Sequence, residues 1–461
     1  MMTVDRDNNK HTIVPKFNET TEQNRLHPLR QFYRSYLARH RVFRALKNIA
    51  IHLFWGVYTP TRWRVAKFIR ANTPKRGHVA IPMNLAPTSS RVLIEAEHWY
   101  DVPSPNFVGK TPTDQKHGAT TPVKSPKLEI AEIIDASIIG GTDLIFKDRT
   151  VIHPDLYNPA TEVCPAETFG LIKVHGKTIR AVNRPKRRVH QAVSLISQCE
   201  GNYAHFLVEV LPRLTVLNQS NLFDDAPILM AKWTHPNFHR ALHAVNQGRR
   251  EIILVDRWES IFVDHLITVS PTAYIVAEHR DHYKTRSLVA SSRERFPFSR
   301  SALLSTKAAI LSNYPNLQPS RGLSRRKYYL RRTMTGNSRR ATNADDAELI
   351  AARMGYHVID PGTMSFDHQV SLFSNASAVT GQIGAALVNT LFSPTGCKIV
   401  GMSPYYPEAN YFFWSNLLGA VGHDLEYVIG NQTESSSHTL HRNYSIDLNE
   451  YSLALERAGD G

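Results

Sequence analysis

The sequence predicts an α/β fold divided into two domains, and three observations support this prediction. The chain has 461 residues, more than the roughly 100–200 residues of an ordinary domain. Hydrophobic residues make up 42% of the sequence, which is enough to build substantial cores. From about Ser194 onward, short apolar runs alternate with helical patterns, as is typical of βαβ units around a parallel sheet.

The alternation places the elements in order. We assign the first domain to residues 128–320 and the second domain to residues 321–450. In the first domain the pattern predicts strands at 130–139, 144–146, 150–152, 227–230 and 252–255, with helices near 205–219 and 238–245. In the second domain it predicts strands at 327–331, 357–359, 378–380 and 398–402, with helices at 344–353, 366–373 and 384–392.

The chain before the first domain has a different composition. Residues 1–24 are polar and are predicted to be disordered, and residues 103–126, rich in Pro, Thr, Lys and Gly, are predicted to form a loop. Residues 25–100 form a basic extension: between Glu22 and Glu95, Lys and Arg occur fourteen times and no acidic residue occurs. Nearly all of the net charge of +15 therefore falls in this extension, and the remainder of the chain is close to neutral.

Apolar residues within the extension recur at helical spacing. This stripe consists of Phe32, Tyr36, Phe43, Leu46, Ala50, Leu53 and Val57. It predicts a basic amphipathic helix, which suits an anionic membrane surface. An ordinary helix packed on the body of the protein is the alternative. Nucleic-acid binding fits less well, because the basicity does not continue into the body.

The cysteines and the N-terminal sequence indicate the cellular compartment in which the protein is expected. Cys164, Cys199 and Cys397 are odd in number and lie at no metal-ligand spacing, so neither a disulfide framework nor a zinc site is predicted. The N-terminus lacks the apolar stretch of a secretory signal. No apolar run reaches the roughly 20 residues needed to cross a bilayer. We therefore expect a cytoplasmic protein, attached at most peripherally to the inner face of the cell membrane.

The stretch TGQIGAALVNTLFSPTG, from Thr380 to Gly396, resembles a ligand-facing turn from a strand into a helix. Gly381 and Gly384 would allow a ligand to approach the backbone closely. The amides at the start of the following helix, from Ala385, would favour an anion such as a diphosphate. A tight turn that only packs the helix on the sheet explains the spacing equally well.

The stretch NYAHFLVEVLPR places His205 and Glu209 four residues apart, on one face of a helix. Either side chain could serve as a general base, with the carboxylate orienting the imidazole. A pair on the protein surface is the alternative.

A third stretch, from Arg325 to Arg340, contains the pair Arg331 and Arg332 at a predicted strand end, and Arg339 and Arg340 in the next loop. Guanidinium groups bind phosphate in bidentate fashion. A solvated basic loop is the alternative here.

The order of these motifs is more specific than any one of them. NYAHFLVEVLPRL is followed by KYYLRR, with Asn343 downstream, and then by HVIDPGTMSFDHQVSLFSNASAVTGQIGAALVNTLFSPTG. Together they resemble the bacterial branch of glycosyltransferase family sixty-one, which includes capsular polysaccharide biosynthesis proteins. The resemblance covers about Glu129 to Gly430. Many family members carry a histidine just before the glycine at 384, where this chain has Ile383, so no role for that histidine is transferred.

This resemblance implies a fold and an activity. The fold would be GT-B-like: two Rossmann-like domains facing a cleft, with the acceptor side on the first domain and the donor nucleotide on the second. The activity would be that of an inverting glycosyltransferase. Such an enzyme moves a sugar from a nucleotide-sugar donor to a polysaccharide or lipid-linked glycan acceptor during synthesis of a capsule or exopolysaccharide.

The resemblance also suggests roles for single residues. His205 or Glu209 would be the catalytic base, and Arg331 would neutralise the departing diphosphate together with amides near Gly384 and Ala385. Donor contacts are also suggested for Arg340, Gly381, Asn389 and Asp360, although Asn389 could instead fix the turn and Asp360, like Gln369, could shape its loop. No metal or other cofactor is expected, because Asp345 and Asp346 suit the first turn of a helix better than a metal site.

A different class of function stays open at this point. The protein could be a non-catalytic nucleotide-sugar or glycan-binding protein that its basic segment recruits to a membrane.

Overall fold

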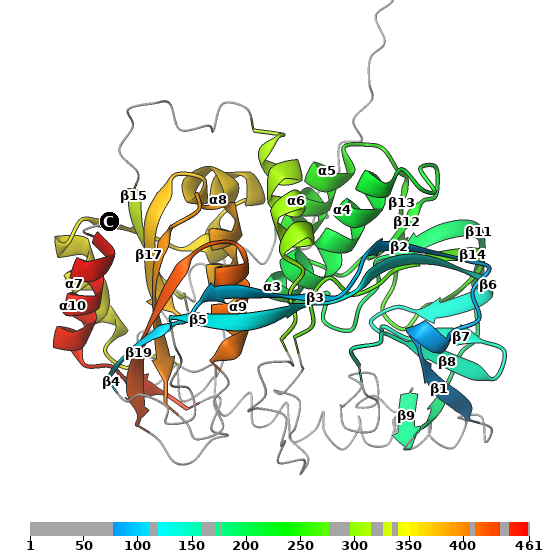
Figure 1. Cartoon of the computed structure of the whole chain (residues 1–461), viewed down its shortest axis with the longest axis horizontal. Helices are drawn as coiled ribbons and strands as arrows, with labels where there is room; N and C mark the ends of the chain where they lie inside the picture. Colours follow the sequence, from blue (N-terminus) through cyan, green and yellow to red (C-terminus); the bar gives the residue numbers. More distant parts are fainter. Residues whose placement is uncertain are drawn as a thin grey trace, which may run out of the picture. The chain divides into compact units, whose positions relative to one another are not determined.

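The structure is a computed structural model, which divides the chain into two compact units, Met1–Asn72 and Thr73–Gly461. It describes residues 77–109, 119–157, 172–175, 177–275, 296–314, 326–333, 340–405, 411–433 and 442–459, all of which lie in the second unit (Figure 1). The predicted tail at 1–24 and the apolar stripe lie outside the described residues, as do most of the Lys and Arg residues of the basic extension. The α/β class is confirmed within the described part.

A first lobe is built on an eleven-stranded sheet. Its strands pair in the order β13-β12-β11-β14-β6-β7-β8-β1-β10-β9, and β2 pairs with β6. The strands are β1 (His78–Pro82), β2 (Ser90–Glu95), β6 (Leu128–Ile139), β7 (Ile145–Lys147), β8 (Thr150–His153), β9 (Ile172–His175), β10 (Thr178–Ala181), β11 (Arg187–Ser194), β12 (Ile228–Ala231), β13 (Ile252–Val255) and β14 (Ser260–Val269). The strands predicted in this region are confirmed, with shifts of a residue or two at their ends.

Helices cover the first sheet between its parallel strands β11, β12, β13 and β14. They are α3 (Tyr203–His205), η5 (Phe206–Val210), α4 (Leu211–Ser220), α5 (Pro236–Asn246) and α6 (Arg300–Leu311), and a short 3₁₀ turn, η2 (Met83–Leu85), follows β1. The predicted helix at 205–219 is therefore confirmed, although η5 interrupts it with a wider π-helical turn.

A second lobe is built on a seven-stranded sheet with the order β16-β15-β17-β18-β19-β20, in which β4 also pairs with β19. Its strands are β4 (Asn106–Gly109), β15 (Arg326–Leu330), β16 (Tyr356–Ile359), β17 (Ala376–Gln382), β18 (Lys398–Pro404), β19 (Asp424–Gln432) and β20 (Tyr444–Ser445). Its helices are α7 (Ala344–Arg353), η9 (Pro361–Thr363), α8 (Phe366–Phe373), η10 (Ala385–Phe392), α9 (Phe412–Ala420) and α10 (Leu448–Gly459). The predicted strands and helices are confirmed, but the helix at 385–392 is a 3₁₀ helix.

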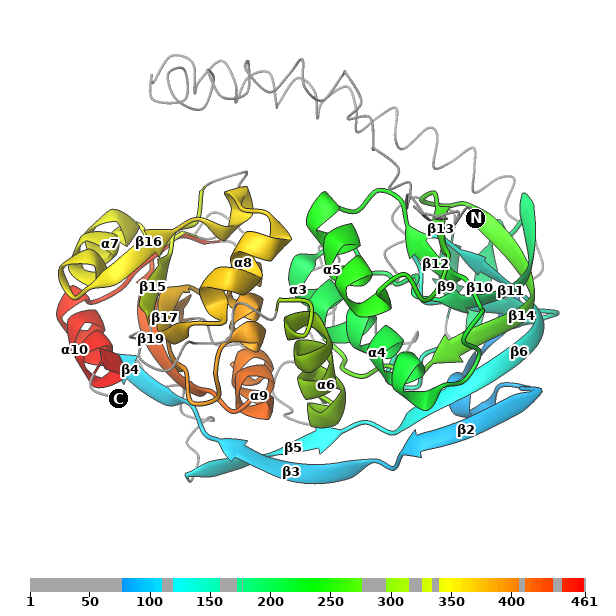
Figure 2. The ribbon, with the colours of Figure 1, turned by 90° about the horizontal axis from the view of Figure 1, so that it is seen from above.

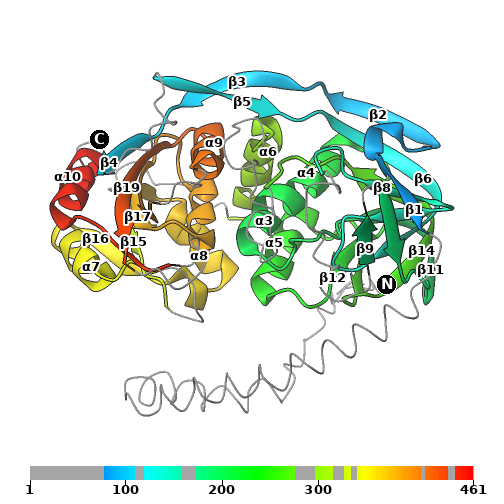
Figure 3. The ribbon, with the colours of Figure 1, turned by 90° about the horizontal axis from the view of Figure 1, so that it is seen from below.

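The predicted loop at 103–126 is wrong for its described part. β3 (His98–Pro103) pairs with β5 (Thr120–Ser125) in a two-stranded ribbon, which continues the β2–β6 pair of the first lobe (Figures 2 and 3). After β3 the chain adds β4 to the edge of the second sheet. Every second residue of β5 is buried, so the alternation of a strand was present beneath the Pro and Thr content.

The ribbon packs on the second lobe. Val102 of β3 is buried against α9, where a Cβ on Gly419 would come within 2.5 Å of the Val102 Cβ. The lobes also meet directly: the side-chain amide of Asn237 in α5 donates to the carbonyl of Met364 at 2.9 Å, and Arg240 pairs with Asp367 of α8. One of the four clusters of buried apolar side chains in the described residues includes side chains from both lobes, so the lobes share part of their core.

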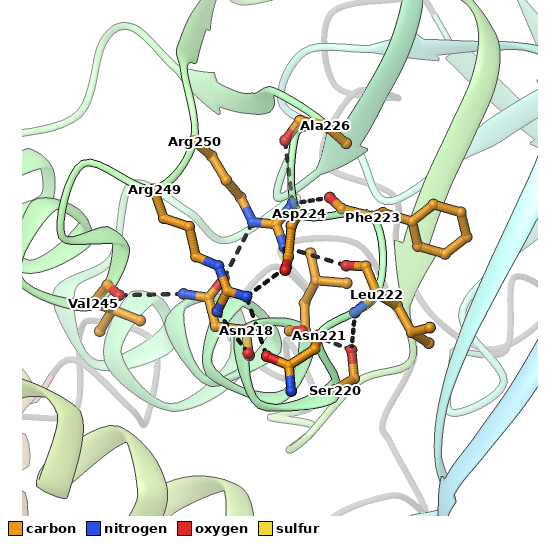
Figure 4. Close-up of polar contacts among 11 residues, drawn as sticks. Asn218, Ser220, Asn221, Leu222, Phe223, Asp224, Ala226, Val245, Arg249 and Arg250 are labelled. Atoms are coloured by element: carbon orange, nitrogen blue, oxygen red, sulfur yellow. Dashed lines mark hydrogen bonds and ion pairs between the residues drawn. The ribbon is translucent and has the colours of Figure 1, made fainter.

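A buried arginine closes the turn that follows α4 (Figure 4). The side chain of Arg250 is fully buried, and it donates hydrogen bonds to Asn218 Oδ1 at 3.1 Å and to three backbone carbonyls of residues 222–226. Asp224 accepts from both Arg250 and the neighbouring Arg249. The chain therefore turns around one guanidinium group.

We expect Arg250→Met to lower the free energy of unfolding by about 3 kcal/mol, because the buried carbonyls and Asp224 lose their donor. Arg249→Met is the matched control: the side chain of Arg249 is 33% exposed, so its loss is expected to cost about 1 kcal/mol or less. Urea unfolding of both variants measures the difference. Equal losses would show that the buried network does not hold the turn.

Candidate functional site

The second sheet has a topological switch point between β15 and β17. β15 pairs in parallel with β16 on one side and with β17 on the other, so the chain leaves β15 in one direction and returns on the opposite side. Open α/β sheets bind ligands outside the carboxyl ends of the strands at such a point. Here the two strand ends carry Arg331 and Arg332 after β15, and Gly384 and Ala385 after β17.

The two glycines near this point differ in what the fold requires of them. A Cβ on Gly381 would come 2.9 Å from Leu330 Cβ and 3.0 Å from the Leu330 carbonyl, so glycine is needed for β15 and β17 to pack. Gly384 has an extended backbone that any residue can adopt, and a Cβ there would meet nothing closer than Arg332 Nη1 at 3.7 Å. The fold therefore does not require glycine at 384, and the close approach of a ligand at this residue stays a prediction.

The paired arginines occupy different surroundings. Arg331 is 55% exposed and forms an ion pair with Glu348 of α7, with Nε 2.8 Å from Glu348 Oε2. The hydrogen bond to Glu348 raises the pKa of Arg331. Arg332 is half-buried and directs its guanidinium towards Gly384. Arg332, which the sequence motif also contains, is thus the arginine at the glycine turn; the predicted clamp role of Arg331 remains a prediction.

Two further predicted donor residues lie at the same end of the second sheet. Arg340 is 40% exposed and pairs with Asp345 of α7 at 3.2 Å. Asp360 follows β16; its carboxylate accepts from the Gly362 amide at 3.1 Å and from the Thr333 hydroxyl. Asp360 therefore connects the loop after β16 to the loop after β15, as the loop-shaping alternative expects.

Asn389 lies deeper in the molecule, at the contact between the lobes. It is fully buried. Its Oδ1 accepts from the Tyr203 hydroxyl at 2.8 Å, and its Nδ2 donates to Gln369 Oε1 at 2.7 Å. These contacts favour the alternative in which Asn389 fixes the turn, and they place the start of α3 against η10.

His205 and Glu209 form a direct pair at the carboxyl ends of β11 and β14. The side chain of Asn202 caps the start of α3 by accepting from the Ala204 amide. His205 Nδ1 lies 2.5 Å from Glu209 Oε2, and each side chain is 12% exposed. Glu209 Oε1 accepts from the backbone N–H of Ile275, 2.5 Å away. The π-helical turn between the two residues is a type of irregularity that is frequent at functional sites.

The pKa of His205 depends on its burial and on two neighbouring side chains. Burial alone would lower the pKa of His205, but the Glu209 carboxylate and a hydrogen bond with Cys199 raise it well above its ordinary value of 6.5. The raised pKa of His205 favours its protonated form, in which Nδ1 donates to Glu209 Oε2 and so orients the carboxylate.

Arg213 lies two helical turns beyond His205 and is the cation of a buried cluster. It interacts electrostatically with Asp143, Glu200 and Glu209, and burial lowers its pKa. Burial raises the pKa of Asp143, and it raises the pKa of Glu200 to about 8. Asp143 and Arg213 also line a cavity. Sequence reasoning missed Asp143 and Glu200, because only the fold brings the turn after β6 to the end of β11; Arg213 was visible in the His205 motif.

Among the residues that the structure describes, no group of three or more His, Cys, Asp and Glu side chains is arranged to hold a metal ion. No helix in this part of the chain is long and apolar enough to cross a membrane.

Comparison with known proteins supports the interpretation of the motifs. Residues 203–400 match the family model described as Glycosyltransferase 61. The match begins at α3, which carries His205, and ends within β18, so it includes both the His205–Glu209 pair and the switch point with Arg332 and Gly384. No curated protein matches the chain. The family match supports a resemblance to glycosyltransferase family 61 and, with it, glycosyltransferase activity.

The two glycines provide a test of the switch point. Gly384→Val is expected to fold and to lose affinity for nucleoside diphosphates, because the branched side chain fills the space beside Arg332. Gly381→Ala is expected to lower the melting temperature by several degrees, because its Cβ clashes with Leu330. Thermal unfolding with and without UDP or GDP measures both effects. A folded Gly384→Val variant with unchanged affinity would exclude the glycine turn as the phosphate site.

Proposed function

We propose that the protein is an inverting glycosyltransferase, which moves a sugar from a nucleotide-sugar donor to a glycan acceptor in surface polysaccharide synthesis. The observation that carries this proposal is the family match over 203–400, because the matched residues include both candidate parts of a transfer site. The first part is the His205–Glu209 pair, and the second is Arg332 beside the glycine turn.

The arrangement of the two lobes supports a GT-B-like enzyme in which one lobe binds the donor and the other binds the acceptor. Each lobe contains parallel strands with connecting helices, and Tyr203 at the start of α3 contacts Asn389 of η10 across the lobes. We assign the donor nucleotide to the second lobe, at the β15–β17 switch point, and the acceptor to the first lobe.

Inverting transfer requires one displacement at the anomeric carbon. The acceptor hydroxyl oxygen forms a bond to this carbon while the bond to the donor diphosphate breaks. Glu209 takes the hydroxyl proton, with His205 and the Ile275 amide holding its carboxylate in place. Arg332 and the first amides of η10 stabilise the negative charge on the departing diphosphate. These groups supply the required chemistry from protein residues alone, so we propose a metal-independent reaction.

The acceptor is proposed to be a polysaccharide or a lipid-linked glycan, reached from the cytoplasm. The basic segment before residue 77 is proposed to hold the enzyme at the anionic inner face of the membrane.

A binding screen tests the donor assignment. Nucleoside diphosphates and nucleotide sugars with uridine, guanosine, cytidine and thymidine bases are added to the protein in EDTA, and thermal unfolding is followed. A true donor at a hundredfold excess over its dissociation constant is expected to stabilise the protein by about 2.7 kcal/mol. Stabilisation that vanishes in EDTA and returns with manganese would contradict the metal-independent site, and no stabilisation by any compound would contradict the donor assignment.

A further inference from the structure

Two tryptophans and an arginine meet at the ends of neighbouring strands in the first lobe. Trp233 follows β12, and Arg257 and Trp258 follow β13. The two strands are parallel, and their last residues, Ala231 and Val255, are paired, so the three side chains share one edge of the sheet. The Arg257 Cζ lies 6.0 Å from the ring centroid of Trp233 and 5.1 Å from that of Trp258.

The backbone at this edge is held in an unusual conformation. Trp258 has a φ of 68°, a left-handed conformation that is rare for a bulky residue and costs on the order of 1–3 kcal/mol. Its amide donates to the Gly140 carbonyl at 3.0 Å, and the Gly140 amide donates to Glu259 at 2.9 Å. These hydrogen bonds hold Trp258 in its strained backbone conformation. We take this as a sign that the position of the Trp258 side chain matters for function.

The surroundings of the three residues suit a ligand. The indole of Trp258 packs on an apolar cluster that includes Leu144 and Phe146, yet both tryptophans remain half-buried and Arg257 is exposed. Arg257 also interacts electrostatically with Glu200, a member of the buried cluster around Arg213. Arg213 in turn interacts with Glu209. Glu200 therefore lies within electrostatic range of both Arg257 and Arg213, which puts this edge close to the buried cluster that also includes Glu209.

We propose that Trp233, Arg257 and Trp258 form a subsite for a pyranose ring of the acceptor glycan. The apolar face of a pyranose packs against indole rings, and a guanidinium donates hydrogen bonds to the ring hydroxyls. The carboxyl ends of parallel strands are where α/β sheets bind ligands. The assignment of the ligand to an acceptor rests on the proposed transferase function.

Four neutral tetrasaccharides serve as probes: maltotetraose, cellotetraose, chitotetraose and xylotetraose. Binding to the full chain is followed by tryptophan fluorescence and by calorimetry. At least one probe is expected to bind with a dissociation constant of about 1 mM or below. Trp233→Ala is expected to weaken that binding at least tenfold, whereas Trp233→Phe, which keeps an aromatic ring, retains most of it. Trp99→Ala, which removes a 51% exposed tryptophan from β3, is the matched control and leaves binding unchanged.

Absence of binding for all four probes would overturn the subsite, as would a folded Trp233→Ala variant with wild-type affinity. If Trp233→Ala does not fold, Arg257→Gln decides, because its exposed side chain can be replaced without opening the core; unchanged affinity in that variant overturns the subsite. Donor turnover is assayed separately. Tetrasaccharide binding without turnover would contradict the transferase and leave the subsite, and turnover without tetrasaccharide binding would contradict the subsite alone.

Discussion

Arg332→Ala is expected to lower donor turnover by about 100- to 1,000-fold, the usual effect of removing one preorganised donor to a developing negative charge. Arg332 is half-buried, and its guanidinium faces Gly384 at the switch point. Negative charge grows on the diphosphate as the sugar leaves, so the loss should appear mainly in kcat. Release of nucleoside diphosphate from the donor that the binding screen identifies provides the measurement.

Arg331→Ala is the matched control for that experiment. The guanidinium of Arg331 is already paired with Glu348 and is more than half exposed, so its removal is expected to lower turnover about tenfold or less. The reverse order of effects would show that Arg331 leaves Glu348 to bind the diphosphate, as the sequence motif alone suggested.

Glu209→Gln is expected to lower turnover by about 100- to 10,000-fold, the range attributed to a positioned acid or base. The amide keeps the size of the side chain but cannot take the proton of the acceptor hydroxyl. Donor affinity is expected to stay unchanged, because the proposed diphosphate site lies on the second lobe. A Glu209→Gln variant with near-normal turnover would exclude this carboxylate as the base.

The Glu209→Gln variant is also expected to change the pKa of His205, which can be measured without an activity assay. In the native protein Glu209 raises the pKa of His205, so the pair contributes stability that is complete below pH 6.5 and is lost as the pH rises through the higher folded pKa. In Glu209→Gln the contribution of the carboxylate is lost, while burial and the hydrogen bond with Cys199 remain, so the pKa of His205 should fall below its native value. Titration of the imidazole by NMR measures this change. An unchanged pKa in a folded variant would mean that the pair does not form in solution.

Helices and strands with a clear apolar pattern in their own residues could be predicted from the sequence. The helices at 344–353 and 366–373 each have an apolar face, the second is capped by Ser365, and the structure has both at the predicted residues. The ribbon around β5 was missed because Pro122 and the threonines outweighed a short alternation. A two-stranded ribbon depends on its partner strand and on α9, and neither is visible in the local sequence.

The residues of the candidate site also fall into two groups, those that could be predicted from the sequence and those that could not. His205 and Glu209 were predictable because helical spacing alone brings them together. Asp143, Glu200 and the Trp233–Arg257 contact could not be predicted, because they join segments far apart in the chain. The choice between Arg331 and Arg332 required the position of Glu348, which only the packing of α7 beside β15 provides.

We have proposed that this protein transfers a sugar from a nucleotide donor that binds at the β15–β17 switch point. The most direct measurement is the release of nucleoside diphosphate when the purified full chain is incubated in EDTA with a panel of nucleotide sugars and glycan acceptors. We expect release from at least one donor, stimulation by an acceptor, and loss of both in Arg332→Ala and Glu209→Gln variants that still unfold cooperatively. Tight binding of a nucleotide sugar with no release in the presence of any acceptor would contradict it, and would instead indicate a nucleotide-sugar-binding protein.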